Sequence, residues 1–444
     1  MRKMLLIAGL IMLCSFLKAQ PPVLEGGEFR VNKTACLTSE ERERIKAALK
    51  VKMAELNLTK TFVQNDDPVK FIWPVVPAPT NTDTGTWGIS NYVDHDAAYP
   101  NKVKDYNCGT RTYDTDGGYN HQGIDIYTWP FGQFKQLNSE VHIVAAAAGV
   151  IIAKGGSQPD NNCSFCTTAC QWNAVYLRHN NGSVTWYGHM KTNSLTTKPV
   201  GATVAEGEFL GVIGSSGNST GPHLHFEVYE NDTYTKLVDP YAGSCNTMNG
   251  TTSWWKNQRA YNKPTINLLQ THFAPPVMPA CPGVETLNDR NVYKLTDTVY
   301  YAAYLIDQLS GNSMSWRLFR PDGTQYAIYN QPLSANYYSS YWYIYWILPN
   351  NTEGYWRIEL TYNSTGQVAK HTFYRGNNPP VYSLKQGNWH DGSTWSTGVV
   401  PAGNEEVFIQ HHIEVNGNAT CKSLRIGEKG RTIVKAGVQL DVLK

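Results

Sequence analysis

The chain has 444 residues, which is too long for one average domain and predicts two to four folded units. It carries 38 Lys and Arg against 36 Asp and Glu, and it has no basic run, so nucleic acid and anionic lipid are not expected partners. After its first twenty residues it has no hydrophobic stretch long enough to predict a membrane span.

The N-terminal segment has the pattern of a signal peptide. Arg2 and Lys3 precede an apolar run that is too short to span a bilayer, and the small residue Ala19 suits cleavage. Removing residues 1–19 takes away three basic residues, so 38 becomes 35 against 36 acidic residues and the mature chain is nearly neutral. We therefore predict a secreted protein, extracellular or periplasmic.

Eight cysteines remain after this cleavage, and an even number in an exported chain predicts disulfides. They are Cys36, Cys108, Cys163, Cys166, Cys170, Cys245, Cys281 and Cys421. The tight group "CSFCTTAC" could bind a metal instead, but it lacks the second paired CxxC that a structural zinc site usually has. We expect disulfides in this group.

Residues 20–86 combine one helix with a proline-rich arm. The stretch "LTSEERERIKAALKVKMAELNL" predicts an amphipathic helix, in which Leu49 and Met53 recur at helical spacing and Thr38 and Glu41 fit a capping box. The prolines of "FIWPVVPAPTNTDTGTWG" exclude an inner strand or a long helix. Such a region ahead of a catalytic unit suggests a pro-region, and a structural extension explains it equally well.

The rest of the chain has the pattern of β structure. Residues 87–245 alternate short β runs with glycine turns, including the hairpin turn "HNNG", and predict an antiparallel unit. After a linker over 246–262, the alternation of "YWRIELTY" and turns such as "RPDGTQ" predict a β-sandwich over 263–376. The tail, 377–444, resembles the opening segment of β-solenoid repeats, and we expect it to be incomplete. The predicted fold is therefore mainly β with a short helical N-terminal region.

One strand of the predicted sandwich, "YWYIYW", has aromatic residues on both faces. Tyr341, Tyr343 and Tyr345 share one side, and one of the two faces must be core. The tyrosine face could stack on sugars, but a ladder of aromatic contacts across neighbouring strands is the simpler interpretation.

Three short segments of the antiparallel unit carry residues suited to metal chemistry. His121 and Asp125 in "GGYNHQGIDIY" are four residues apart, so both point to one side of an extended chain. His223 and His225 in "GPHLHFEV" share a strand face for the same reason. His189 lies in "TWYGHM", after the hairpin. Each segment alone has an ordinary structural explanation, but together they suit a metal held between two β segments.

In this order the three segments resemble the lysostaphin-type zinc metallopeptidases, the family of LytM-like domains. The resemblance implies the duplicated-hybrid-motif fold, an antiparallel β metallopeptidase domain, and one zinc ion held by His121, Asp125 and His225. It implies that His189 and His223 line the site without binding the metal. Such a ligand set leaves one position for water. The chain has no HExxH motif, so His189 and His223 are left to move the proton and stabilise the oxyanion.

The resemblance runs from residue 121 to about residue 230, with one departure. The cysteine-bearing insertion "SQPDNNCSFCTTACQ" at 157–171 is expected at the rim of the substrate groove. Glu227 shares the strand face of His225 and could orient that ligand, although a surface salt bridge is the simpler interpretation.

These features predict an exported, monomeric zinc metalloendopeptidase that cleaves peptide cross-links of bacterial cell-wall peptidoglycan. One alternative is an extracellular protease acting on glycine-rich proteins. Another is a non-catalytic scaffold that binds the wall or activates an amidase. Degenerate family members of that kind usually lose ligands, whereas this chain keeps all five site residues. If the N-terminal region is inhibitory, a chain beginning near Trp87 should be more active than one beginning at Gln20.

Overall fold

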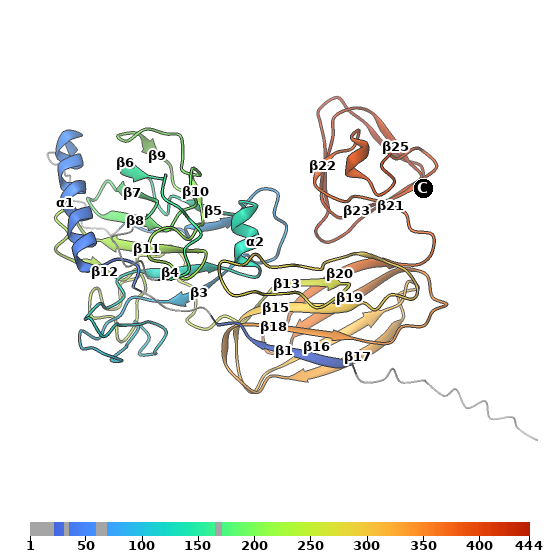
Figure 1. The fold of residues 1–444 in the computed structure, drawn as a ribbon, viewed down its shortest axis with the longest axis horizontal. Coiled ribbons are helices and arrows are strands. Elements are labelled where there is room, and N and C mark those ends of the chain that lie inside the picture. The colour runs from blue at the N-terminus through green and yellow to red at the C-terminus, as the bar shows by residue number, and fades with distance from the viewer. Residues whose placement is uncertain (1–21, 31–34, 59–68, 165–170) are drawn as a thin grey trace, which may run out of the picture.

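A computed structural model describes residues 22–30, 35–58, 69–164 and 171–444 (Figure 1). The predicted signal peptide lies outside these residues. Among the residues that are described, none of the helices combines the length and the apolar character needed to cross a membrane.

The first β unit contains two antiparallel sheets, as the glycine-punctuated pattern predicts. Its large sheet has eight strands, and the small sheet has three. The large sheet runs in the order β3 (Trp87–Asn91), β4 (Ile124–Thr128), β11 (His223–Tyr229), β8 (Val184–Gly188), β7 (Ala174–Arg178), β6 (Gly149–Gly155) and β9 (Thr203–Val204), with β12 (Leu237–Val238) paired to β11. The small sheet consists of β10 (Phe209–Val212), β5 (Val141–Val144) and β2 (Val75–Pro77), and a short helix, α2 (Gly132–Leu137), follows β4.

The core of this unit includes residues on both sides of the predicted range 87–245. Phe71 and Val75 come from the proline-rich arm, and Trp254 and Trp255 come from the predicted linker; all four are buried in one cluster with strands β4 and β11. The arm enters the core through the short edge strand β2, which ends at Pro77 and pairs with β5; an edge position tolerates proline. A chain that began at Trp87 would therefore lack part of its own core.

The predicted helix is α1 (Ser39–Glu55), and its capping box is present as expected. The Thr38 hydroxyl accepts from the Glu41 backbone N–H, and the Glu41 carboxylate accepts from the Thr38 N–H, both at 3.1 Å. Leu49 and Met53 pack into an apolar cluster formed largely by strands β6, β7, β8 and β11. The helix thus lies on the outer edge of the first β unit (Figure 1).

The second β unit is the predicted sandwich. One sheet has the order β1 (Val23–Glu28), β18 (Tyr337–Tyr345), β15 (Tyr300–Gln308) and β13 (Thr265–His272). The other has the order β14 (Val292–Tyr293), β20 (Gln367–Arg375), β19 (Gly354–Tyr362), β16 (Ser313–Phe319) and β17 (Gln325–Pro332). Strand β1 comes from the predicted N-terminal region, 20–86, and pairs with β18 over six residues. This region therefore does not fold separately: β1 joins the sandwich, whereas α1 and β2 pack on the first unit.

The aromatic strand of the sandwich packs as a cross-strand ladder. Ile344 and Trp346 lie in the core, whereas Tyr343 and Tyr345 face the other side. Tyr300 on β15 contacts both tyrosines, with ring centroids 6.3 and 5.2 Å apart. These contacts are the aromatic pairs expected between neighbouring strands.

The tail is a coil of parallel strands, in keeping with the solenoid resemblance, and Figure 1 shows its triangular outline. Its sheets pair successive turns of the chain. They are β21 (Val381–Tyr382), β23 (Glu406–Ile409) and β26 (Ser423–Ile426); β22 (Gly387–Asn388), β24 (His412–Val415) and β27 (Arg431–Val434); and β25 (Ala419–Cys421) with β28 (Leu440–Val442). A short 3-10 helix, η2 (Gly392–Thr394), lies between the buried Trp389 and Trp395.

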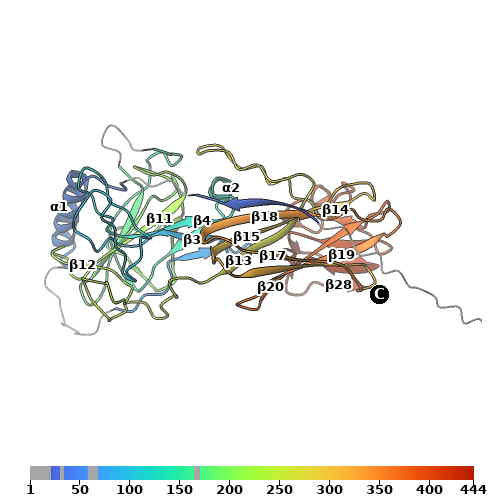
Figure 2. The ribbon, with the colours of Figure 1, turned by 90° about the horizontal axis from the view of Figure 1, so that it is seen from below.

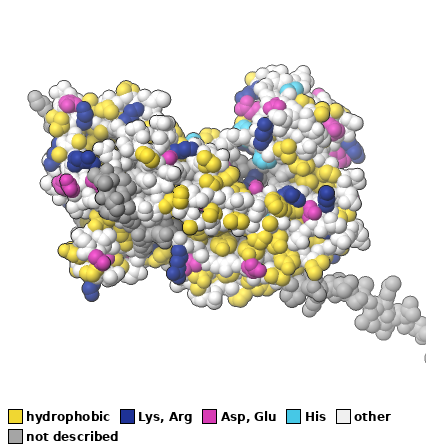
Figure 3. Space-filling view, in the orientation of Figure 1, with side chains coloured by type: hydrophobic (Ala, Val, Ile, Leu, Met, Phe, Trp, Pro, Cys, Tyr) yellow, Lys and Arg dark blue, Asp and Glu magenta, His cyan; other side chains and the backbone are white. Residues whose placement is uncertain are grey.

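The three units are joined by buried charges as well as by the chain. Asp83 contacts Lys135 of α2 and lies 3.0 Å from Lys429 of the tail. The two lysines lower the pKa of this carboxylate despite its burial. Figure 2 shows the first unit at one end and the sandwich overlapping the tail at the other, and Figure 3 shows a hollow between the first unit and the tail. Lys429 also donates to the side-chain oxygen of Gln270 on β13 at 2.7 Å, so side chains of all three units meet here.

Two disulfides are present among the described residues. They join Cys108 to Cys245 and Cys163 to Cys281. Cys36 and Cys421 are buried free thiols, so the expectation that all eight cysteines pair is wrong for these two. The expectation that "CSFCTTAC" forms disulfides is confirmed for Cys163, and the other two cysteines of that group lie outside the described residues.

Neutral histidines buried in the sandwich predict acid sensitivity. Burial lowers the pKa of both His272 and His371 from 6.5 to about 4. Because the unfolded chain takes up these protons at higher pH than the folded chain does, stability is complete above pH 6.5 and is lost as the pH falls towards 4. The loss should reach up to about 3 kcal/mol for each group. Thermal unfolding between pH 7 and pH 4 measures it, and His371→Asn should flatten the profile; an unchanged profile would contradict the assignment.

Candidate active site

The register of three neighbouring strands brings the predicted residues together. On the antiparallel pair β4 and β11, Asp125 lies opposite His225. On the other side of β11, His225 lies opposite Gly188 of β8, and His189 follows directly. His121 lies in the loop just before β4. Residues separated by up to 104 positions in the chain therefore meet at one point of the large sheet.

The inner atoms of His121, Asp125 and His225 converge. His121 Nε2 lies 3.1 Å from Asp125 Oδ1, His225 Nδ1 lies 3.0 Å from the same oxygen, and the two nitrogens are 3.3 Å apart. All three side chains are buried. These are the donor types that bind zinc.

Contacts on the outer side fix two of these side chains. His121 Nδ1 lies 2.7 Å from the backbone oxygen of Tyr92, which can only accept. The Nδ1 atom therefore carries the hydrogen, and the Nε2 lone pair points inward. Asn91 of β3 donates its side-chain amide to Asp125 Oδ2 at 3.0 Å, which leaves Oδ1 facing the histidines. Such outer contacts hold metal ligands in their binding orientation.

Glu227 fixes the third side chain, and the expectation of a surface salt bridge is wrong for it. Its carboxylate is fully buried, with Oε2 3.0 Å from His225 Nε2. Its other oxygen contacts the guanidinium of Arg42, which is itself buried and comes from helix α1. Burial alone would raise the pKa of Glu227, but Arg42 and His225 lower it to about 2. The carboxylate is therefore ionised, and it connects helix α1 to His225.

His189 and His223 form a pair beside this cluster, with ring centroids 4.3 Å apart. Their Nδ1 atoms lie 2.6 Å from the backbone oxygen of Ser216 and 2.9 Å from that of Gly221. Both rings therefore present Nε2 to the site, and His189 Nε2 is buried without a hydrogen-bond partner among the described residues. His189 also has a left-handed backbone, with φ of 61°, which is uncommon outside glycine and typical of functional positions.

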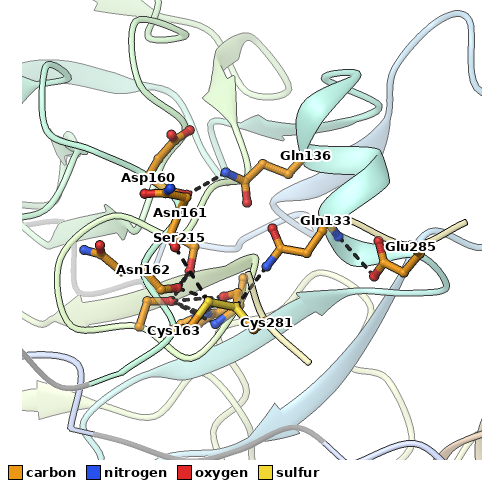
Figure 4. Close-up of a disulfide and its surroundings, with 12 residues drawn as sticks. Gln133, Gln136, Asp160, Asn161, Asn162, Cys163, Ser215, Cys281 and Glu285 are labelled. Carbon is orange, nitrogen blue, oxygen red and sulfur yellow. Dashed lines mark hydrogen bonds between the residues drawn. A yellow bond between two sulfur atoms is a disulfide. The ribbon is translucent and has the colours of Figure 1, made fainter. Parts of the chain in front are cut away.

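The described part of the cysteine-bearing insertion supports the turn that carries these carbonyl groups. The Ser215 hydroxyl donates to the backbone oxygen of Asn162 at 2.6 Å and contacts the Ser219 hydroxyl at 2.8 Å. The next residue of the insertion, Cys163, is bonded to Cys281 (Figure 4). The disulfide thus ties this support to the segment that follows strand β13.

One residue of the site was not predicted. Cys36, just before α1, is buried, and its Sγ lies 3.4 Å from the Tyr113 hydroxyl, 3.8 Å from Asp125 Oδ1 and 4.0 Å from His223 Nε2. Its neighbours lie 77 to 187 positions away in the chain, so no local pattern could reveal the contact. The cysteine count favoured a disulfide instead.

Comparison with known proteins agrees with this geometry over part of the chain. A segment of 107 residues is 37% identical to the "DD-carboxypeptidase/endopeptidase Mpg" of Neisseria meningitidis serogroup B, and it covers 24% of this chain and 19% of that protein. A segment of 59 residues is 41% identical to the "Peptidoglycan DD-endopeptidase ShyC" of Vibrio cholerae, and it covers 13% of each chain. The chain therefore spans less than a fifth of the length of either relative.

A solved structure and a family description extend the comparison. The structure is the catalytic domain of a mutant of the prophage-encoded M23 protein EnpA from Enterococcus faecalis; it is 21% identical, with a TM-score of 0.19, covering 39% of this chain and 94% of that one. Residues 119–240 match Peptidase family M23, and all five predicted site residues lie inside this range. Residues 119–240 thus form a domain of peptidase family M23, as the resemblance to the lysostaphin-type enzymes predicts.

Proposed function

We propose that the protein is an exported zinc metalloendopeptidase that hydrolyses peptide bonds in bacterial peptidoglycan. The observation that carries the proposal is the convergence of three buried donor atoms, from His121, Asp125 and His225, beside two histidines whose Nε2 atoms face the same space. The named activities of the relatives support the substrate class. The two disulfides support an oxidising compartment.

The residues present fit a zinc ion. Two imidazole nitrogens and one carboxylate oxygen are a ligand set of catalytic zinc sites. His121, Asp125 and His225 would hold the ion, and their outer contacts with Tyr92, Asn91 and Glu227 already orient them for it. A zinc ion held there supplies Lewis acidity, which polarises the scissile carbonyl and makes a water molecule more acidic.

His189 and His223 handle the proton and the developing negative charge. Their Nδ1 atoms face backbone carbonyl oxygens, so each ring keeps its Nδ1 hydrogen and presents Nε2 to the substrate side. A neutral ring can accept a proton from water at Nε2, and a protonated ring can donate a hydrogen bond to the oxyanion. The burial of both rings excludes bulk water, which strengthens these interactions.

Purified protein lacking residues 1–19 tests this function on purified peptidoglycan. Because the Cys36 thiol lies among the site residues, the assay includes a Cys36→Ala variant. We expect soluble peptide fragments whose masses identify the bond that is cut, and we expect a chelator to abolish their release until zinc is restored. Removal of a single essential metal should reduce the rate to background.

Two other results would contradict the proposal. Cleavage of glycine-rich proteins without release of wall fragments would favour an extracellular protease. Binding of the wall without hydrolysis by either protein would favour a scaffold.

A further inference from the structure

Cys36 occupies the space between the two halves of the site. Its Sγ shares one group with His121, Asp125 and His225, and a second group with His189 and His223; in each group the donor atoms lie within 4.8 Å of one another. Its side chain is buried, and it forms no disulfide. The thiol thus lies where a substrate carbonyl would need to approach both the metal ligands and the two catalytic histidines.

The position fits a fourth metal ligand. Donor atoms of a tetrahedral zinc site lie roughly 3.3 to 3.8 Å apart, as bond lengths of about 2.0 to 2.3 Å require. The three nitrogen and oxygen donors are 3.0 to 3.3 Å apart, and Cys36 Sγ lies 3.8 Å from Asp125 Oδ1. A thiolate is a strong zinc ligand, and four protein ligands leave no open position.

The chain on both sides of Cys36 is anchored to the M23 domain. On one side, Ala35 packs in a small cluster with Tyr113 and Tyr119. On the other side, Leu37 is buried in the cluster beneath α1, and the capped helix begins two residues later. The helix then places Arg42 against Glu227, the carboxylate that contacts His225. These contacts fix the thiol over the site.

The packing of α1 against the large sheet leaves a space unfilled, as expected for a segment that must dissociate. A pocket of about 300 Å³ remains between α1 and the edge of the large sheet, lined by residues such as Leu37, Ile45 and Ala153. Apart from Arg42 and Glu41, the other charged side chains of α1 are not fully buried. The helix is therefore held mainly by one apolar strip and one buried ion pair.

We propose that Cys36 is the fourth ligand of the metal and keeps the enzyme latent, an inference that rests on the proposed function of the site. On binding, the thiol releases its proton to solvent and a sulfur–metal bond forms in place of a water–metal bond. On release, water returns and the thiol regains a proton. The segment that contains Cys36 and α1 is thus an inhibitory pro-region.

Spectroscopy tests the ligand without any substrate. Chelated protein is reloaded with Co²⁺, because a thiolate bound to cobalt gives an intense near-ultraviolet charge-transfer band that imidazole and carboxylate ligands do not give. We expect the band in the wild-type protein and in Cys421→Ala, which removes the other described buried free thiol far from the site. We expect its loss in Cys36→Ala and Cys36→Ser. A wild-type protein without the band, or a band that survives in both Cys36 variants, would overturn the proposal.

Thiol labelling covers the case in which the Cys36 variants do not fold. In the wild-type protein, mass-mapped alkylation of Cys36 should be slow with Co²⁺ or Zn²⁺ bound and fast after chelation. Equal rates with and without metal would overturn the proposal. The measurement follows Cys36 alone, so the state of the other cysteines does not affect it.

Measurements of peptidoglycan hydrolysis distinguish a failure of the latency proposal from a failure of the proposed function. Cys36→Ala should hydrolyse peptidoglycan at least about tenfold faster than the wild type, as expected if the open state is at most about a tenth populated. Cys421→Ala should match the wild type. A cobalt–thiolate band in a protein that cleaves nothing, even as Cys36→Ala, would refute the proposed function and leave the ligand assignment standing. Strong wild-type hydrolysis without a band would refute latency and leave the function standing.

Discussion

Replacing His189 or His223 with alanine should lower peptide-bond hydrolysis by about a hundredfold or more while metal content stays near one ion per chain. Neither ring is needed to complete the set formed by His121, Asp125 and His225, so the metal should remain. The loss of rate is the size usual for one proton-transfer group or one oxyanion donor. The Cys36→Ala background keeps latency from hiding the effect, and metal analysis beside a rate measurement gives both quantities.

The metal-ligand variants should behave differently. Alanine at His121, Asp125 or His225 should lower zinc content and activity together, with some loss of stability because metal binding is coupled to folding. An exposed histidine of the tail, His390, provides the matched control, and His390→Ala should change neither quantity. If His189→Ala lost its metal while His225→Ala kept it, the assignment of ligands would be wrong.

Asp307→Asn should destabilise the protein by about 3 kcal/mol or more. Asp307 is buried on β15 of the sandwich and lies 2.8 Å from Arg111 and 2.6 Å from Arg259, both of which precede the sandwich in the chain. Removing its charge leaves the fully buried Arg111 without a counter-ion, which is costly in an apolar environment. Asparagine suits the left-handed backbone at this position, φ 53°, so the substitution isolates the charge.

Urea unfolding measures this effect, with Asp297→Asn as the control. Asp297 also pairs with an arginine, Arg290, at 3.3 Å, but both side chains of that pair are partly exposed to solvent. Its loss should cost no more than about 1 kcal/mol. If the two variants lowered the free energy of unfolding equally, the buried ion pairs of Asp307 would stabilise the protein no more than an exposed pair does.

The local patterns of the sequence predicted the elements and much of the site. Helical spacing and the Thr38–Glu41 pair predicted α1 and its cap, and the even spacings of His121 with Asp125 and of His223 with His225 predicted shared strand faces. These features depend on neighbours within a few residues. That the segment with His121 and Asp125 lies beside the segment with His223 and His225 was predicted from the family resemblance, because periodicity alone does not show which strands are neighbours.

The features that were missed all depend on contacts between distant parts of the chain. Glu227 seemed a surface residue because its partner, Arg42, is 185 positions away. The sequence placed Phe71 in the proline-rich arm and Trp255 in the linker, yet both are buried in the core of the first unit. Cys36 was expected to form a disulfide because the number of cysteines is even, and an even number does not show which thiols remain unpaired. Only the tertiary structure brings these residues to their partners.

Strand β1 has a consequence for how the N-terminal region behaves after proteolysis. Its six residues are hydrogen-bonded along the edge of the sandwich at β18, and α1 follows it in the chain. If a protease cut between α1 and β2, the fragment would remain docked as a second chain rather than diffuse away. A docked fragment has an effective concentration near its target in the millimolar range, far above that of a free peptide. Cutting the chain would therefore yield a two-chain complex, and lasting removal of the fragment would also require β1 to leave the sheet.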